Sequence, residues 1–261
     1  MTRKILRELC AHNTYERGEL VLAKLKSLGV DAKVQDFKGE KRDYRNIIGR
    51  LRNGSSRHHI ALAAHYDKND DGEGAIDNGA GVAELLSVLG KLTSNNEGLD
   101  VSFLFFDGEE DSCIGSRYFV DNLDRRFTGV YNVDFAGVGN SVLIATESYD
   151  NLTGQYVQND LKLNYRVQSV CEDKGVQVYQ VKSPMGDNVP FSQYSIASTV
   201  IFTLPEEEAR SWQRAGDPWE GYDNLPTLRL VNGPGDTLDK VTPKTLDMMT
   251  DVLFKLVNSY R

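Results

Sequence analysis

Polar side chains that can bind a divalent metal ion follow three apolar segments of the chain. His65 and Asp67 close the run HHIALAAHYD, Glu109 and Glu110 close VSFLFFDGEE, and Asp134 lies within TGVYNVDFAG. An imidazole and several carboxylates form a ligand set of intermediate hardness that suits zinc or another divalent ion. The carboxylates would repel one another if they met alone, and a bound cation would offset their charge. The sequence therefore predicts a metal site where these segments converge.

Each candidate also has an ordinary structural interpretation. A single histidine at a strand end, such as His65, is often a buried residue with satisfied hydrogen bonds. Asp77 opens the helical segment IDNGAGVAELL, where a carboxylate commonly caps the helix by accepting backbone N–H groups. Paired acids such as Glu109 and Glu110 usually promote solubility on a surface turn, and Asp134 could bond a neighbouring loop. The order of these positions and their placement at successive strand ends favour one shared site.

The pattern of apolar residues predicts the elements that must position these side chains. Helices are predicted over residues 3–28, with a break near 12–14, and over 78–92, 116–123 and 243–260, the last with Thr242 as its cap. Strands are predicted at 31–39, 44–53, 58–67, 101–110, 128–137, 141–146 and 197–204. Alternating strands and helices indicate an α/β three-layer sandwich, in which helices flank a mainly parallel, mixed central sheet. Such open sheets bind ligands beyond the carboxyl ends of their strands.

The overall composition fits one soluble domain, residues 1–261, and restricts its partners. A net charge of −8 argues against nucleic acid or an anionic membrane as a partner, and the basic residues of segment 41–57 alternate with apolar ones, as on the solvent face of a strand. No segment is apolar enough for a signal peptide or a membrane span. Cys10, Cys113 and Cys171 do not form a disulfide framework, so we expect a cytoplasmic location. Cys113 is expected to be structural.

The motifs occur in an order that resembles a known family of metalloenzymes. The series AAHYD, DGEGAIDNGAGVAELL, LFFDGEEDSCIGSRYFV, NVDFAGVG, GDNVPF and NGPGDTLDKV resembles the co-catalytic di-zinc aminopeptidases over roughly residues 44–255. Relatives of that family include single-zinc glutaminyl cyclases and enzymatically silent ectodomains of the transferrin-receptor type. The resemblance implies a metal-dependent aminopeptidase that hydrolyses N-terminal residues of peptides through a metal-bound water.

The same resemblance implies a role for each motif residue. Glu109 would be the general base. Asp67 would contact the histidine ligand and orient it, without binding the metal itself. Asp77 would bridge two metal ions. The metal ligands that the family pattern implies are His65, Asp77, Glu110 and Asp134.

The chain departs from the family at both of the late histidines. The last family ligand is a histidine in a pattern such as His-Thr-Pro-x-Asp-Thr, and here Asn232 begins NGPGDT. The family pattern Ser-Asp-His-x-Pro-Phe is replaced by GDNVPF, and no histidine follows His65. A neutral amide oxygen is a weak ligand for zinc and suits harder ions. We therefore expect one tight zinc site at His65, Asp77 and Asp134, and a weaker second site, which could hold another divalent metal, at Asp77, Glu110 and Asn232.

Alternatives to an active aminopeptidase remain open. The chain could be a catalytically silent binding module that kept the fold, or a metal-dependent hydrolase or cyclase of altered specificity. A cyclase of the family type would need the late histidine, and a silent module has no reason to keep Glu109 beside the metal ligands. Retention of Glu109 favours an enzyme that acts on a peptide or a small amino-acid-derived substrate. The segment 211–230 carries both tryptophans and is either a lid or pocket wall, or a loop held by its aromatic residues.

Overall fold

The computed structural model describes residues 1–52, 57–94, 98–124, 126–219 and 224–261. Within these residues one sheet has the strand order β1-β2-β4-β3-β5-β9-β6-β7, and β8 also pairs with β6. The strands are β1 (Ala32–Lys38), β2 (Asp43–Leu51), β3 (His59–His65), β4 (Asp100–Phe106), β5 (Gly129–Val133), β6 (Ser141–Asp150), β7 (Gln155–Gln158), β8 (Gln177–Ser183) and β9 (Ser198–Leu204).

The centre of the sheet is parallel and its outer parts are mixed. β3 runs parallel to β4 and β5, and β5 runs parallel to β9. β1 and β2 form an antiparallel pair that joins β4, while β6 is antiparallel to β9 and parallel to β8. The predicted α/β sandwich with a mixed, mainly parallel central sheet is confirmed.

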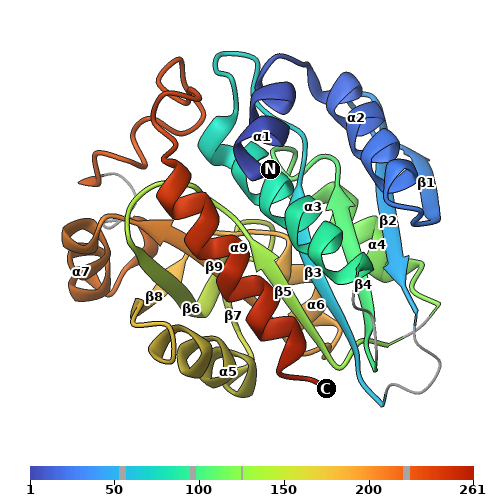
Figure 1. The fold of residues 1–261 in the computed structure, drawn as a ribbon. Coiled ribbons are helices and arrows are strands. Elements are labelled where there is room, and N and C mark those ends of the chain that lie inside the picture. The colour runs from blue at the N-terminus through green and yellow to red at the C-terminus, as the bar shows by residue number, and fades with distance from the viewer. Residues whose placement is uncertain (53–56, 95–97, 125, 220–223) are drawn as a thin grey trace.

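Helices cover both faces of this sheet. Figure 1 shows α3 and α9 in front of the sheet, with α1 beside them, and α4 and α6 behind it. Within the described residues, no helix combines the length and the apolar character needed to cross a membrane. The helices are α1 (Thr2–Cys10), α2 (Thr14–Ser27), α3 (Ala80–Thr93), α4 (Ile114–Asp121), α5 (Leu161–Glu172), α6 (Asn188–Gln193), α7 (Glu206–Ala215) and α9 (Pro243–Asn258).

The position of β3 in the middle of the sheet explains why its residues are apolar throughout and do not alternate with polar ones. Every residue of β3 is buried. Ile60, Leu62 and Ala64 face the larger core under α3 and α9, whereas Ala61 and Ala63 face a smaller core with Phe119 and Phe191 of α4 and α6. Side chains alternate between the two faces of a strand, so a central strand covered on both sides needs apolar residues throughout.

Local signals place several helix ends where the sequence predicts them. The predicted break near residues 12–14 separates α1 from α2, and Asn13 and Glu16 form a reciprocal capping box at the start of α2. The Thr242 hydroxyl accepts the N–H of Thr245 at 3.2 Å and caps α9. Strand β2 ends at Leu51, and the end of the predicted strand 44–53 lies outside the described residues.

The register of the parallel strands brings the predicted site residues to one edge. His65 of β3 lies opposite Phe106, the last residue of β4, so the turn that carries Glu109 starts at the same level. β5 ends at Val133, and Asp134 follows it directly. The carboxyl ends of adjacent parallel strands thus present these side chains together, as expected for an open α/β sheet.

Candidate metal centre

The side chains of His65, Asp77 and Asp134 meet at the carboxyl edge of the sheet. His65 ends β3, Asp134 follows β5, and Asp77 lies in the short helical turn η1 (Ala75–Gly79) ahead of α3. His65 Nε2 lies 2.9 Å from Asp77 Oδ1 and 3.5 Å from Asp134 Oδ1. All three side chains are buried, and one ligand atom from each lies within 4.8 Å of the others. The sequence-predicted ligands of the first ion therefore converge.

The donor atoms of this triad fit a metal ion better than a hydrogen-bonded cluster. The two ring nitrogens of His65 and Asp77 Oδ1 are buried, and their close contacts lack the angles of well-formed hydrogen bonds. Two ligands about 2.0–2.1 Å from one tetrahedral zinc ion lie about 3.3 Å apart, and the separations of 2.9 and 3.5 Å bracket that value. Burial lowers the pKa of His65, but the carboxylates around it raise that pKa well above its usual value. The surroundings thus favour positive charge, which a zinc ion would supply.

Asp67 contacts both the histidine and the glutamate pair. Its Oδ1 lies 3.3 Å from His65 Nδ1 and accepts the backbone N–H of Glu109 at 3.2 Å. Its Oδ2 accepts the backbone N–H of Glu110 at 3.2 Å. The contact at Nδ1 leaves Nε2 of the histidine facing the other carboxylates, which is the orientation a metal ligand needs. One buried carboxylate therefore positions His65 and the turn that carries Glu109.

Glu109 and Glu110 are half-buried on the turn between β4 and α4. Burial raises the pKa of Glu109 well above its usual range and the pKa of Glu110 to about 9, with a further increase from neighbouring carboxylates and a decrease from His65. A carboxylate of raised pKa binds a proton more strongly, which suits a residue that accepts a proton from water. Cys113 Sγ donates to Glu109 Oε1 at 3.5 Å, and burial raises the pKa of that thiol well above its usual value. A structural thiol fits these contacts.

Asp77 is held by a carboxylate that the sequence did not single out. Asp236 Oδ1 accepts the N–H of Ile76 at 2.6 Å, and Asp236 Oδ2 accepts the N–H of Asp77 at 3.1 Å. Asp236 itself is buried. Asp77 does not cap α3, which was its alternative role. The N-cap of α3 is Gly79, and no side chain accepts a hydrogen bond there. The acidic residue that remains in NGPGDT therefore fixes the backbone of a candidate ligand.

A buried arginine from α2 holds the loop between His65 and Asp77. Arg17 Nη1 donates to the carbonyl of Tyr66 at 3.3 Å, and its Nη2 donates to the carbonyls of Glu73 and Gly74 at 2.5 and 2.9 Å. Its Nε donates to the carbonyl of Leu9 in α1 at 3.1 Å. The Arg17 side chain is fully buried. Sequence reasoning missed this residue because its partners are backbone groups, which leave no pattern of residue types.

Asn232 lies at the mouth of the site beside Glu110. Its Oδ1 accepts a hydrogen bond from Asn69 Nδ2 at 2.5 Å, and the same nitrogen donates to Glu110 Oε2 at 2.8 Å. Asn69 and Asn232 are both exposed. Among the described histidines, cysteines and acids, only His65, Asp77 and Asp134 form a group of three with ligand atoms this close, and Glu110 is not in it. Glu110 and Asn232 are instead joined through the amide of Asn69.

The motif GDNVPF places one more acid against the triad. A side chain at Gly186 would touch Asp134 Oδ2, and the adjacent Asp187 is buried with its pKa raised to about 7, mainly by burial. Asn188, which replaces a family histidine, donates to Ser148 Oγ at 2.9 Å and to Asn159 Oδ1 at 2.8 Å. Asn188 is therefore part of the buried framework, while Asp187 is a buried acid, not assigned by sequence reasoning, whose pKa is lowered by His65 and raised by Asp67 and Asp134.

The tryptophan-bearing segment 211–230 divides between core and surface, and residues 220–223 lie outside the described residues. Trp212 of α7 is buried and its ring lies 5.6 Å from that of Phe202. Trp219 is partly exposed and packs edge-on against Tyr149. Leu225 and Leu228 are buried in the main core. These contacts fit a loop held by its aromatic and apolar residues, and Trp212 is not part of a pocket wall.

A cavity of about 600 Å³ opens beside the triad and is lined by Asp67, Glu110 and Asn69 together with Tyr15 and Arg42. It mixes acidic, basic and aromatic side chains, and among the proposed second-ion ligands Glu110 lines it. Asp67, which contacts His65, is the link between this cavity and the triad.

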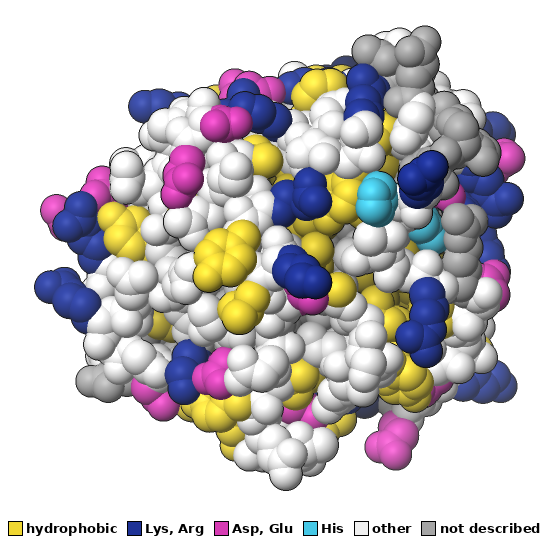
Figure 2. Space-filling model, turned by 90° about the horizontal axis from the view of Figure 1, so that it is seen from below, with side chains coloured by type: hydrophobic (Ala, Val, Ile, Leu, Met, Phe, Trp, Pro, Cys, Tyr) yellow, Lys and Arg dark blue, Asp and Glu magenta, His cyan; other side chains and the backbone are white. Residues whose placement is uncertain are grey.

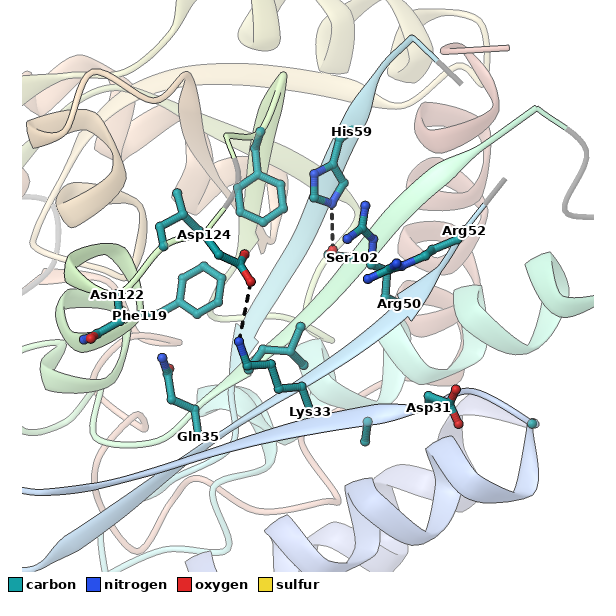
Figure 3. Close-up of a pocket in the computed structure, with 15 residues that line it drawn as sticks. Asp31, Lys33, Gln35, Arg50, Arg52, His59, Ser102, Phe119, Asn122 and Asp124 are labelled. Atoms are coloured by element: carbon teal, nitrogen blue, oxygen red, sulfur yellow. Dashed lines mark hydrogen bonds and ion pairs between the residues drawn. The ribbon is translucent and has the colours of Figure 1, made fainter. Parts of the chain in front are cut away.

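A separate cavity of about 590 Å³ lies at the other end of the strands (Figure 3). His59 and Ser102 line it, and His59 Nε2 lies 2.9 Å from Ser102 Oγ. His59 begins β3 and His65 ends it, so about 20 Å of strand separates the cavity from the triad. Figure 2 views the protein from this end and shows basic and acidic side chains interspersed among hydrophobic ones. None of the sequence-predicted site residues lines this cavity.

Comparison with known proteins finds aminopeptidases among the relatives of this chain. A leucine aminopeptidase 2 from Arthroderma otae is 27% identical over 230 residues, which cover 82% of this chain and 44% of that protein. The chain thus spans less than half the length of the curated relatives that it matches first.

Solved structures share the fold. The glutaminyl cyclase of Porphyromonas gingivalis superposes with a TM-score of 0.77 at 18% identity, over 99% of this chain and 96% of that one. A zinc aminopeptidase from Bacillus subtilis superposes with a TM-score of 0.66 at 23% identity, over 84% of this chain and 50% of that one. The model of peptidase family M28 matches residues 46–257. Because that match covers most of the chain, the protein belongs to peptidase family M28.

Proposed function

We propose that this protein is a metal-dependent aminopeptidase that removes N-terminal residues from peptides. The observation that carries the proposal is the convergence of His65, Asp77 and Asp134 on one buried point, with Glu109 positioned by the same Asp67 that contacts the histidine. The family match and the leucine aminopeptidases among the relatives support the reaction class. The neighbouring cavity, which Asp67 and Glu110 line, offers room for the end of a peptide.

The residues divide the chemistry between binding and proton transfer. His65, Asp77 and Asp134 would hold a zinc ion, which supplies Lewis acidity and lowers the pKa of water to about 7. Glu109 takes a proton from the attacking water and returns it to the amine that leaves. Asp67 lies 3.3 Å from His65 Nδ1 and would leave Nε2 free to bind the ion, and it holds Glu109 through the backbone.

A panel of aminoacyl chromogenic amides, tested with zinc, manganese or cobalt, examines this proposal. We expect turnover that depends on the metal and that falls by about a hundredfold or more in Glu109→Gln, because a general base contributes about 10²–10⁴-fold. Glu207→Gln, at an exposed position on α7, is the matched control and should leave the rate unchanged. Absence of turnover with every metal would instead support a catalytically silent binding module. Cyclisation of an N-terminal glutaminyl peptide in the same assay would assign the altered-specificity alternative.

We also propose a cytoplasmic location. All three cysteines are free thiols, and Cys113 and Cys171 are buried. Free thiols fit a compartment that keeps cysteine reduced. Fractionation of the native host, with the protein traced by antibody, should find it with cytosolic markers, and recovery with secreted or membrane material would contradict the proposal.

A further inference from the structure

The side chain of Asn69 connects Glu110 and Asn232. In the family pattern, these two positions would bind the second metal ion and not the first. Its single amide nitrogen donates to Glu110 Oε2 at 2.8 Å and to Asn232 Oδ1 at 2.5 Å. A primary amide carries two N–H groups, so one of them serves each acceptor. Asn69 belongs to the loop between His65 and Asp77, which Arg17 and Asp236 hold in place. The amide therefore reaches Glu110 and Asn232 from a fixed loop.

The position of that amide competes with a second ion. A cation bound by Glu110 Oε2 and Asn232 Oδ1 would compete with the Asn69 amide, which already donates to both oxygen atoms. An exposed, neutral amide oxygen such as that of Asn232 adds little affinity for zinc in return. The donor set of the second position does not fit a tightly held zinc ion.

The Asn232 amide can also lie with its oxygen and nitrogen exchanged, and the hydrogen bond from Asn69 to Asn232 is then lost. With its oxygen and nitrogen exchanged, Asn232 Nδ2 would lie 2.7 Å from Glu110 Oε1 and could itself donate to that carboxylate. The hydrogen bond from Asn69 to Glu110 exists in either case. Glu110 thus has an amide donor in both orientations, where the family pattern would give it a metal.

We propose that this chain holds one metal ion, at His65, Asp77 and Asp134, and that the amide of Asn69 takes the place of a second ion by bridging Glu110 and Asn232. The inference deepens the proposed function and rests on it for the identity of the first site. It departs from the two-ion arrangement implied by the resemblance. Glu110 becomes a hydrogen-bonded carboxylate at the mouth of the site and is not a ligand of the resident ion.

Counting zinc ions per folded chain tests the proposal without relying on activity. The protein is stripped with chelator, loaded at graded free zinc, and analysed by elemental analysis and calorimetry. We expect wild type to bind one ion tightly, and no second ion until free zinc is at least a hundredfold higher. Two ions of similar affinity in wild type would overturn the proposal.

Substitutions at Asn69 and Asn232 make the test specific. Asn69→Asp keeps the size of the side chain but replaces the amide donor with a carboxylate ligand, so it should create a second zinc site at least tenfold tighter than that of wild type. Asn232→His should tighten the second site, and Asn69→Asp combined with Asn232→His should tighten it further. Asn151→Asp, on an exposed turn, is the control and should bind one ion. A second site that is unchanged in Asn69→Asp would contradict the role given to the amide.

The two proposals can fail separately. One ion per chain without hydrolysis of any peptide substrate would leave the amide bridge standing and refute the aminopeptidase. Two tight ions together with hydrolysis would refute the amide bridge and leave the aminopeptidase standing.

Discussion

The carboxylate of Asp236 accepts the backbone N–H of Asp77 at 3.1 Å, although 158 positions of the chain lie between these residues. Asp236 also accepts the N–H of Ile76 at 2.6 Å, so it holds two successive peptide groups. Asp236 therefore fixes the place at which Asp77 enters the triad. Asp236 thus has a structural role, although the motif NGPGDT that contains it lacks the histidine ligand of the family pattern.

The first prediction concerns this contact. Asp236→Asn replaces one charged acceptor by an amide that cannot accept both N–H groups equally, and hydrogen bonds to charged groups contribute about 1.5–3 kcal/mol. We expect zinc affinity to fall by about 10- to 100-fold while the protein stays folded, as competition with a chromogenic chelator would measure. Asp239→Asn, at an exposed neighbouring position, is the control. Equal zinc affinity in Asp236→Asn and wild type would contradict the assignment.

The second prediction concerns the buried guanidinium of α2. Arg17→Lys keeps the positive charge but cannot reach the carbonyls of Leu9, Tyr66, Glu73 and Gly74 together. Each buried acceptor left without a donor costs about 1–3 kcal/mol. We expect the free energy of unfolding in urea to fall by about 3 kcal/mol or more.

Zinc binding separates a positioning role for Arg17 from a purely structural one. In the folded Arg17→Lys protein the loop that ends at Asp77 should be less fixed, so the zinc dissociation constant should rise by about tenfold or more. Arg7→Lys, exposed on α1, should change neither quantity. Lower stability with an unchanged zinc affinity would limit Arg17 to supporting the fold.

The third prediction concerns Asp67. Asp67→Asn removes the charge beside His65 Nδ1 and weakens the acceptors of the Glu109 and Glu110 N–H groups. Loss of such a partner of a metal ligand typically costs about 10- to 100-fold in metal affinity or activity. We expect both quantities to fall, and at saturating zinc we still expect a lower kcat, because Glu109 is misplaced. Full recovery of kcat at saturating zinc would restrict Asp67 to orienting His65.

The fourth prediction concerns a buried acid far from the chemistry. Glu84 of α3 is fully buried, neither of its carboxylate oxygens has a hydrogen-bond partner in the described part of the chain, and burial raises its pKa well above 4.5. Below about pH 4.5 the folded and unfolded chains both keep this proton, so Glu84 adds no pH dependence to the free energy of unfolding. At higher pH the unfolded chain releases the proton and the folded chain keeps it, which lowers the free energy of unfolding by about 1.4 kcal/mol per pH unit.

Glu84→Met removes this pH-dependent loss. The metal-free variant should be more stable than wild type at pH 7, by up to about 3 kcal/mol, and the gain should shrink as the pH falls towards 4.5. Urea unfolding at several pH values measures both slopes, with exposed Glu207→Met as the control. A pH slope in Glu84→Met equal to that of wild type would show that the carboxyl is ionised in the folded protein.

Much of the site could be predicted because strand ends leave a clear signal. Apolar runs that finish in polar residues mark His65 and Asp134, and parallel register then forces them together. Contacts between side chains and backbone have no such signal, and Arg17 and Asp236 therefore emerged only from the structure. Asn69 emerged there too, because its hydrogen bonds join side chains that are far apart in the sequence. The sequence also did not predict β7, β8, α5, α6 and α7, which are short or carry weak apolar patterns.

The hydrogen bonds of Arg17 bear on where the smallest working unit of this protein begins. The family model starts at residue 46, whereas Arg17 lies on α2, and α1 contributes Ile5, Leu6 and Leu9 to the main core. A chain shortened to the matched segment would expose that apolar surface and would leave the ligand-bearing loop without its internal brace. The two N-terminal helices therefore belong to the same folded unit as the candidate metal centre, and any truncation meant to isolate that unit should keep them.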